Sequence, residues 1–104
     1  MTYLLAIDQG TTSTRCVIYD EGLNIIKSEQ EEYPLLYPVD GWVEVDPNKL
    51  LESVYDTLDP MLDSSFEIVC AGITNQRETT LVWDSLSGLP IYNGIVWQDR
   101  RTAD

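Results

Sequence analysis

A short run near the start of the chain combines residue types that bind phosphate and a divalent cation. It reads Asp8-Gln9-Gly10-Thr11-Thr12-Ser13-Thr14-Arg15 and lies between two apolar stretches. Gly10 lets the backbone turn tightly, and the hydroxyls after it form a donor-rich concavity suited to phosphate. The Asp8 carboxylate is of the kind that holds Mg²⁺ or its waters. No lysine follows, so the run is not a P-loop. The alternative is an ordinary Gly-Thr turn.

A second candidate site is the pair Arg77-Glu78, which follows the apolar run 68–74. A glutamate accepts hydrogen bonds from two hydroxyls while a guanidinium donates to others, so such a pair suits a vicinal diol. Side chains at the carboxyl end of a buried strand often face a ligand in α/β proteins. Taken by itself, the pair is better explained as a structural ion pair.

Trp97 is the third candidate, because a tryptophan face stacks on the carbon side of a polyol while its N–H finds a partner. Core packing explains it equally well on chemistry alone. We interpret Trp42 and Trp83 as packing residues. The sequence defines no role for Arg100 or Arg101.

Composition excludes several classes of function. A chain of 104 residues with a net charge of −12 makes one domain and does not suit nucleic acid or an anionic membrane. The two cysteines lack C-x-x-C spacing and there is no histidine, which argues against a metal site and predicts two buried free thiols, Cys16 and Cys70. No apolar run is long enough to span a bilayer and no signal peptide is evident, so we expect a cytoplasmic protein.

The elements that must position these residues follow from turn and cap signals. Residues 3–7, 15–19 and 24–31 predict a three-stranded antiparallel meander. Asp46 and Pro47 predict the start of a helix that Pro60 ends near Asp59. Its apolar face is expected to consist of Leu50, Leu51, Val54, Tyr55, Leu58, Met61 and Leu62. Residues 68–74 predict a strand covered on both faces, and residues 79–83 and 89–92 a second hairpin.

Four stretches together resemble the FGGY carbohydrate kinases of the actin, hexokinase and sugar-kinase superfamily. They are the first hairpin, the run Gly41-Trp42-Val43-Glu44, the run Gly72 to Thr80, and the run Asn93 to Thr102. They occur in the expected order over essentially the whole chain. Within the family they are most similar to the glycerol kinases. At Asp99 the chain differs from many glycerol kinases, which leaves the substrate less defined.

The resemblance implies an α/β fold with the ribonuclease-H-like, actin-like ATPase mixed sheet. Residues 1–104 would form the N-terminal portion of the first domain, with a meander, one helix, a buried fourth strand and a second hairpin; the C-terminal lobe would be absent. By resemblance, the nucleotide phosphates contact Thr11, Thr12, Ser13 and Arg15, and Asp8 lies near Mg²⁺ through water. Glycerol would contact Arg77, Glu78 and Trp97. No catalytic residue is expected in the chain, because the family's base lies beyond Asp104.

The function implied by the resemblance is ATP-dependent phosphorylation of glycerol to glycerol 3-phosphate by a full-length homo-oligomeric enzyme. ATP would be the co-substrate and Mg²⁺ the cofactor. The isolated chain is expected to be inactive. The alternatives are another FGGY sugar or polyol kinase, and a non-catalytic binding or assembly module that retains the fold.

Overall fold

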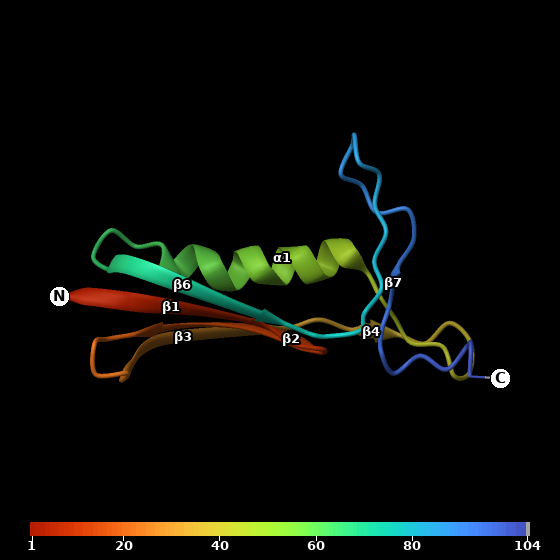
Figure 1. The fold of residues 1–104 in the computed structure, drawn as a ribbon, viewed down its shortest axis with the longest axis horizontal. Coiled ribbons are helices and arrows are strands. Elements are labelled where there is room, and N and C mark those ends of the chain that lie inside the picture. The colour runs from red at the N-terminus through yellow and green to blue at the C-terminus, as the bar shows by residue number, and fades with distance from the viewer. Residues whose placement is uncertain (104) are drawn as a thin grey trace.

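The computed structural model describes residues 1–103 and has an elongated shape of 54 × 30 × 18 Å. Its main body is a four-stranded sheet in the order β3-β2-β1-β6 (Figure 1). The strands are β1 (Thr2–Gln9), β2 (Ser13–Tyr19), β3 (Ile25–Glu32) and β6 (Glu67–Asn75). The first three are antiparallel neighbours, and β6 pairs with β1 in parallel. The predicted meander is therefore confirmed, and every strand boundary lies within two residues of its expected position.

Helix α1 (Pro47–Leu58) begins where the sequence predicts, because Asp46 caps it by accepting a hydrogen bond from Asn48 N at 2.9 Å. A short 3₁₀ helix, η1 (Asp59–Met61), follows it and contains Pro60. The helix runs along one face of the sheet (Figure 1). The main core lies between the two and consists of Leu5, Ile7, Cys16, Ile18 and Met61.

The face that α1 and η1 turn to the sheet agrees with the predicted one only in part: Met61 is buried in the main core and Leu58 packs against it. The buried residues of α1 are Ser53 and Thr57, whose hydroxyls lie 2.7 Å from Thr14 Oγ1 and 3.3 Å from Cys16 Sγ respectively. Leu51 and Tyr55 are half-exposed, at 50% and 54%. Small hydroxyl residues let the helix approach the sheet closely, and the apolar stripe is wider than this contact.

The predicted burial of the fourth strand is wrong for this chain. All residues of β6 except Ile68 are exposed. The strand lies at the edge of the sheet, and α1 packs mainly against β2 and β3. Cys70 on β6 is consequently exposed, whereas Cys16 is buried; both are free thiols.

A smaller sheet, in the order β4-β5-β7, lies beyond the N-terminal end of α1 (Figure 1). It contains β4 (Leu35–Leu36), β5 (Glu44–Val45) and β7 (Gly94–Ile95). A Cβ on Gly94 would lie 2.9 Å from Val45 Cγ1, so glycine permits this close pairing of β5 with β7.

The second hairpin is present in reduced form. Asp84 N donates to Leu89 O at 2.8 Å and Ile91 N to Val82 O at 3.0 Å, but the arms form isolated bridges rather than strands. The arm projects away from the body (Figure 1), and Leu86 at its turn is 98% exposed.

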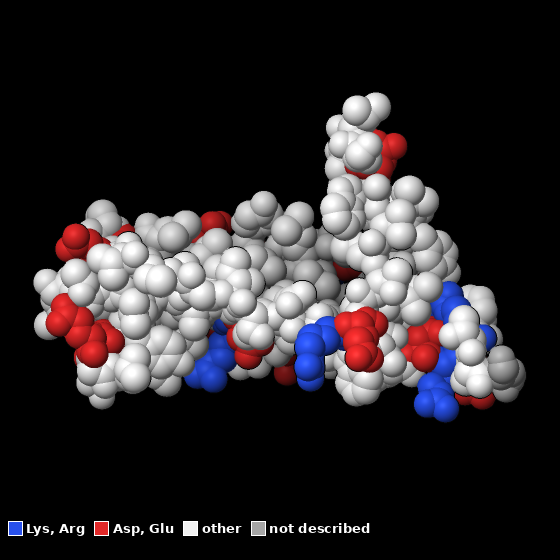
Figure 2. All heavy atoms as spheres, in the orientation of Figure 1, with Lys and Arg blue, Asp and Glu red and all other residues white. Residues whose placement is uncertain are grey.

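The surface carries many acidic groups, in keeping with the net charge. On the face drawn in Figure 2 the basic side chains lie along the lower edge and near the C-terminal end, beside acidic ones. Within residues 1–103 no helix is long and apolar enough to cross a membrane. In the same residues no group of three or more metal-binding side chains gathers.

Candidate functional site

The first predicted site is the turn between β1 and β2. Gly10 N donates to Ser13 O at 2.8 Å and closes the turn, and a Cβ on Gly10 would lie only 3.1 Å from the same oxygen. Thr12 is exposed at the tip, while its carbonyl accepts from Tyr33 N at 3.0 Å. Ser13 Oγ accepts from Gln30 Nε2 at 3.1 Å. The turn is therefore fixed by backbone bonds and presents the Thr12 side chain to solvent.

Asp8 and Arg15 lie directly opposite each other on β1 and β2, so their side chains share one face of the sheet. Both are exposed, and Arg15 Nε donates to Ser28 Oγ at 3.2 Å. The turn of residues 10–13 is called the phosphate-type turn below. An exposed single carboxylate beside it fits Mg²⁺, because that ion keeps several waters and takes one or two carboxylates. It does not suit a metal that requires an all-protein cage.

A buried polar cluster behind the turn was not predicted. Gln9 Nε2 donates to Gly10 O at 2.8 Å and to the Tyr33 hydroxyl at 2.7 Å, and that hydroxyl in turn contacts Gly10 O. Gln76 Nε2 donates to Tyr33 at 3.2 Å, and Gln76 N donates to Gln9 O at 2.8 Å. Burial raises the pKa of Tyr33, so it stays a neutral donor. The cluster ties the phosphate-type turn to the segment that begins Arg77-Glu78.

The structure brings Arg77, Glu78 and Trp97 together around one pocket of about 250 Å³. Arg77 and Glu78 follow the end of β6, and Trp97 follows β7. Glu78 has a φ of 61°, a left-handed conformation that a glutamate rarely adopts. No ion pair joins Arg77 to Glu78 in the described part of the chain, so the ion-pair alternative has no support from the geometry.

One hydrogen bond connects this pocket with the turn. Trp97 Nε1 donates to Thr11 Oγ1 at 3.1 Å. Trp97 is 52% exposed, so it is not the core residue of the alternative interpretation. Trp97 therefore links the pocket that it lines to a hydroxyl of the phosphate-type turn.

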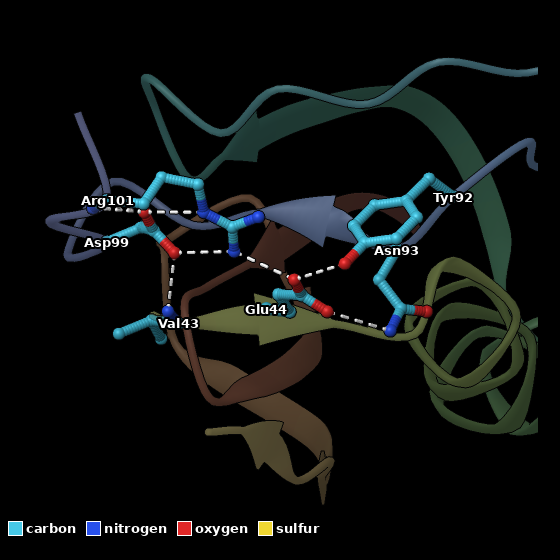
Figure 3. A network of polar contacts seen from close by, with 6 residues as sticks. All are labelled: Val43, Glu44, Tyr92, Asn93, Asp99 and Arg101. Carbon is cyan, nitrogen blue, oxygen red and sulfur yellow. Dashed lines mark hydrogen bonds and ion pairs between the residues drawn. The ribbon is translucent and has the colours of Figure 1, made fainter. Parts of the chain in front are cut away.

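Figure 3 shows a second polar network, which was not predicted. It adjoins the pocket, because its Asp99 and Arg101 line a neighbouring pocket together with Glu78 and Trp97. Arg101 Nη2 lies 2.7 Å from Glu44 Oε2 and 2.8 Å from Asp99 Oδ2. Glu44, only 2% exposed, also accepts from Tyr92 and Asn93. The hydrogen bonds from Arg101 hold the pKa of both carboxyls below their usual range, and the carboxylates raise the pKa of Arg101.

Of the two tryptophans interpreted as packing residues, one packs and the other does not. Trp42 packs against Arg101, whose Cζ is 4.0 Å from the ring centroid. Trp83 is 57% exposed on the projecting arm and is not a core residue. Arg100 is exposed and contributes its backbone N–H to Gly41 O at 2.7 Å. Asp99 and Arg101, to which the sequence assigned no role, belong to the network of Figure 3.

Curated proteins similar to this chain carry the name glycerol kinase. The one from Roseobacter denitrificans is 52% identical over 99% of this chain and 22% of its own length. The one from Alteromonas mediterranea is 53% identical over 97% of this chain and 21% of its own length. The chain thus spans about a fifth of the length of these relatives.

Solved structures agree with this similarity. A Plasmodium falciparum glycerol kinase with ADP superposes with a TM-score of 0.87 at 39% identity, over 97% of this chain and 21% of that one. A xylulose kinase from Rhodospirillum rubrum gives a TM-score of 0.90 at 21% identity, over 98% and 22%, which shows a shared fold alone. Residues 3–104 match the N-terminal domain of the FGGY family of carbohydrate kinases. The chain therefore belongs to the FGGY family of carbohydrate kinases.

Proposed function

We propose that this chain is the N-terminal part of a longer homo-oligomeric cytoplasmic enzyme that transfers a phosphoryl group from ATP to glycerol. The observation that carries the proposal is the pocket of Arg77, Glu78 and Trp97, joined to the phosphate-type turn through the bond from Trp97 to Thr11. Phosphoryl transfer requires an acceptor hydroxyl beside the transferred phosphate, and the bond from Trp97 to Thr11 supports two neighbouring subsites. The similarity to glycerol kinases, at about half identical residues, supports glycerol as the polyol.

In the polyol subsite each side chain has a distinct task. The Glu78 carboxylate accepts hydrogen bonds from hydroxyls, and the Arg77 guanidinium donates to hydroxyl oxygens. The Trp97 ring covers the carbon side of the polyol, while its N–H stays on Thr11. Together they orient a vicinal diol so that one terminal hydroxyl faces the turn.

In the phosphate subsite the turn supplies donors. Thr11, Thr12 and Ser13 offer hydroxyls, and Arg15 extends from the same face of the sheet as Asp8. Bound Mg²⁺ would neutralise phosphate charge; Asp8 would hold it through water. Arg15 adds a second positive charge for the transferred group.

The chemistry also needs a base for the acceptor hydroxyl. We place that base, together with the nucleoside-binding part, in the portion of the relatives' length that this chain does not span. The 104-residue chain alone should consequently give no ATP-dependent turnover.

The test uses the full-length protein and the variants Glu78→Gln and Arg77→Ala. Each variant leaves a polar group of the bound polyol without its hydrogen-bond partner. The loss of transition-state stabilisation, measured from kcat/KM for glycerol, should be about 1–3 kcal/mol. The KM for ATP should change much less. Arg100→Ala and Glu67→Gln are matched controls, because both side chains are exposed and lie outside the pocket lining.

Melting temperatures of the same variants separate binding from structure. If Glu78→Gln and Arg77→Ala melt early but use glycerol normally, the assignment of the polyol subsite is wrong. Parallel assays with xylulose and gluconate test the alternative acceptors, because kinases of these sugars share the fold. Preference for either over glycerol would replace glycerol in the proposal and keep the reaction class.

A further inference from the structure

We propose that Asp99 is a positioning residue that holds Trp97 in the pocket by fastening the turn 96–99 to Val43. The placement of Trp97 stands independently of the reaction, whereas the kinetic consequence rests on the function proposed above. Asp99 touches none of Arg77, Glu78 or Thr11 through a hydrogen bond in residues 1–103; it acts through the backbone that carries Trp97.

The turn is attached to Val43 at both ends. Asp99 N donates to Val96 O at 2.8 Å, which closes a four-residue turn with Trp97 and Gln98 at its tip. Val96 N donates to Val43 O at 3.0 Å, and Val43 N donates to Asp99 Oδ2 at 2.6 Å. The Asp99 carboxylate thus takes the place that a backbone carbonyl would have in a continuing strand ladder.

The turn needs this attachment because little else fixes Trp97. Its side chain is 52% exposed, and its hydrogen bond is the one to Thr11 Oγ1. A half-exposed ring buries less apolar surface than a core ring, so packing restrains it less. The direction in which the backbone leaves Val96 therefore decides whether the indole N–H reaches Thr11.

Arg101 and Glu44 fix the carboxylate itself (Figure 3). Arg101 donates to Asp99 from its backbone N and from Nε, both at 2.9 Å, and from Nη2 at 2.8 Å. Glu44 holds the same Nη2 at 2.7 Å from the buried strand β5. These bonds hold Asp99 in the orientation in which Oδ2 accepts from Val43 N.

The first test is spectroscopic and needs no activity. In the full-length protein labelled with fluorinated tryptophan, the Trp97 fluorine signal is identified by its loss in Trp97→Phe. Thr11→Val gives the position of this signal when the bond from the indole is lost. In Asp99→Asn, one carboxylate oxygen is replaced by an NH₂ group, which cannot accept the hydrogen bond from Val43 N or from Arg101. The turn should then loosen, so the Trp97 signal should move toward the Thr11→Val position and show a larger solvent isotope shift.

The matched control is Asp20→Asn, which removes a carboxylate that also caps a turn, by accepting from Gly22 N and Asn24 N at 2.9 Å. It should leave the Trp97 signal in place. If Asp99→Asn does not fold, Asp99→Glu keeps the charge for Arg101 but moves the carboxylate by one methylene, and the same shift is expected. A folded Asp99 variant with an unchanged Trp97 signal overturns the proposal.

The second test is a double-mutant cycle on glycerol kinetics. Displacement of a substrate-positioning group lowers kcat/KM by up to about 100-fold. If Asp99 acts through Trp97, the loss caused by Asp99→Asn should be much smaller in a Trp97→Phe background, whereas a merely structural role gives additive losses. Additive losses overturn the proposal. If no polyol is phosphorylated at all, the proposed function fails and the fluorine measurement still decides the role of Asp99.

Discussion

Glu78 combines an unusual backbone with a place in the candidate pocket. Its φ of 61° lies in the left-handed region, where a side chain crowds the backbone. Such residues cost of order 1–3 kcal/mol and persist where the surrounding structure fixes them, often at binding sites. The left-handed residue therefore coincides with the pocket that Glu78 lines together with Arg77 and Trp97.

The backbone of Glu78 gives a stability prediction with an unusual sign. In ordinary positions glycine is less stable than alanine by roughly 0.5–1 kcal/mol. At Glu78 alanine keeps the crowding and glycine relieves it, so Glu78→Gly should be at least as stable as Glu78→Ala. Urea unfolding of the two variants measures the difference. A Glu78→Gly variant less stable than Glu78→Ala by the ordinary amount would show that the residue is not strained.

At this scale the sequence predicts residues whose chemistry is visible in their type. Their chemistry suits a polyol, but it left an ion pair and core packing open, and the resemblance decided for Arg77, Glu78 and Trp97; these three residues line one pocket in the structure. Tyr33 and Gln76 were missed, because a buried tyrosine hydroxyl between two glutamines depends on three segments meeting. Nothing in an irregular proline-containing stretch indicates that its tyrosine turns inward.

The network of Glu44, Asp99 and Arg101 connects elements rather than single residues. It joins β5 to the segment that follows β7, across 57 positions in the chain for the pair Arg101 and Glu44. No local pattern signals a contact of this kind, which is why the sequence assigned no role to Asp99 or Arg101. Removing one partner would leave buried charge without compensation.

The network predicts a dependence of stability on acid. The pKa values of Asp99 and Glu44 are lowered from 3.8 and 4.5 in the folded protein, chiefly by hydrogen bonds from Arg101. Their contribution to stability is therefore complete above these unfolded values and is lost as the pH falls through the lower folded values. Urea unfolding measured from about pH 6 down to about pH 3 should show stability falling less steeply for Asp99→Asn than for the unaltered protein. Equal slopes would contradict the coupling.

The boundaries of helices and strands were predicted well where nearby residues determine them, whereas burial was predicted poorly where contacts with distant elements determine it. The start of α1 follows from Asp46 and Pro47, and the meander from short turns between apolar runs. The exposure of β6 could not be predicted. A run of apolar residues is compatible with a buried strand, but it does not indicate whether another element covers that strand. The part of the contact face of α1 that Ser53 and Thr57 form was missed, since these residues pack through small size and hydroxyl bonds rather than hydropathy.

The whole molecule presents an uncovered strand at one edge of its main sheet. Val69 and Ile73 on β6 are 58% and 75% exposed, although both are apolar. An edge strand with free pairing groups and apolar side chains is a template for another chain. β6 is thus the outer strand next to β1, and all its residues except Ile68 are exposed.

We expect the 104-residue chain to self-associate through β6 at high concentration. Ile73→Lys should weaken this association, because an edge lysine opposes strand pairing between copies. Leu86→Lys is the control: it removes an exposed apolar side chain from the projecting arm instead. Light scattering over a wide concentration range measures both. A strict monomer, or equal weakening by the two lysines, would refute association through β6.

The contrast between the two thiols has a practical consequence. Cys70 is exposed on β6, whereas Cys16 is buried and burial raises its pKa, so an alkylating reagent should modify Cys70 first. Cys70 is therefore a built-in chemical label for the edge of the sheet. Its rate of alkylation in the short chain, compared with that in the full-length protein, reports directly whether β6 gains a cover when the rest of the polypeptide is attached.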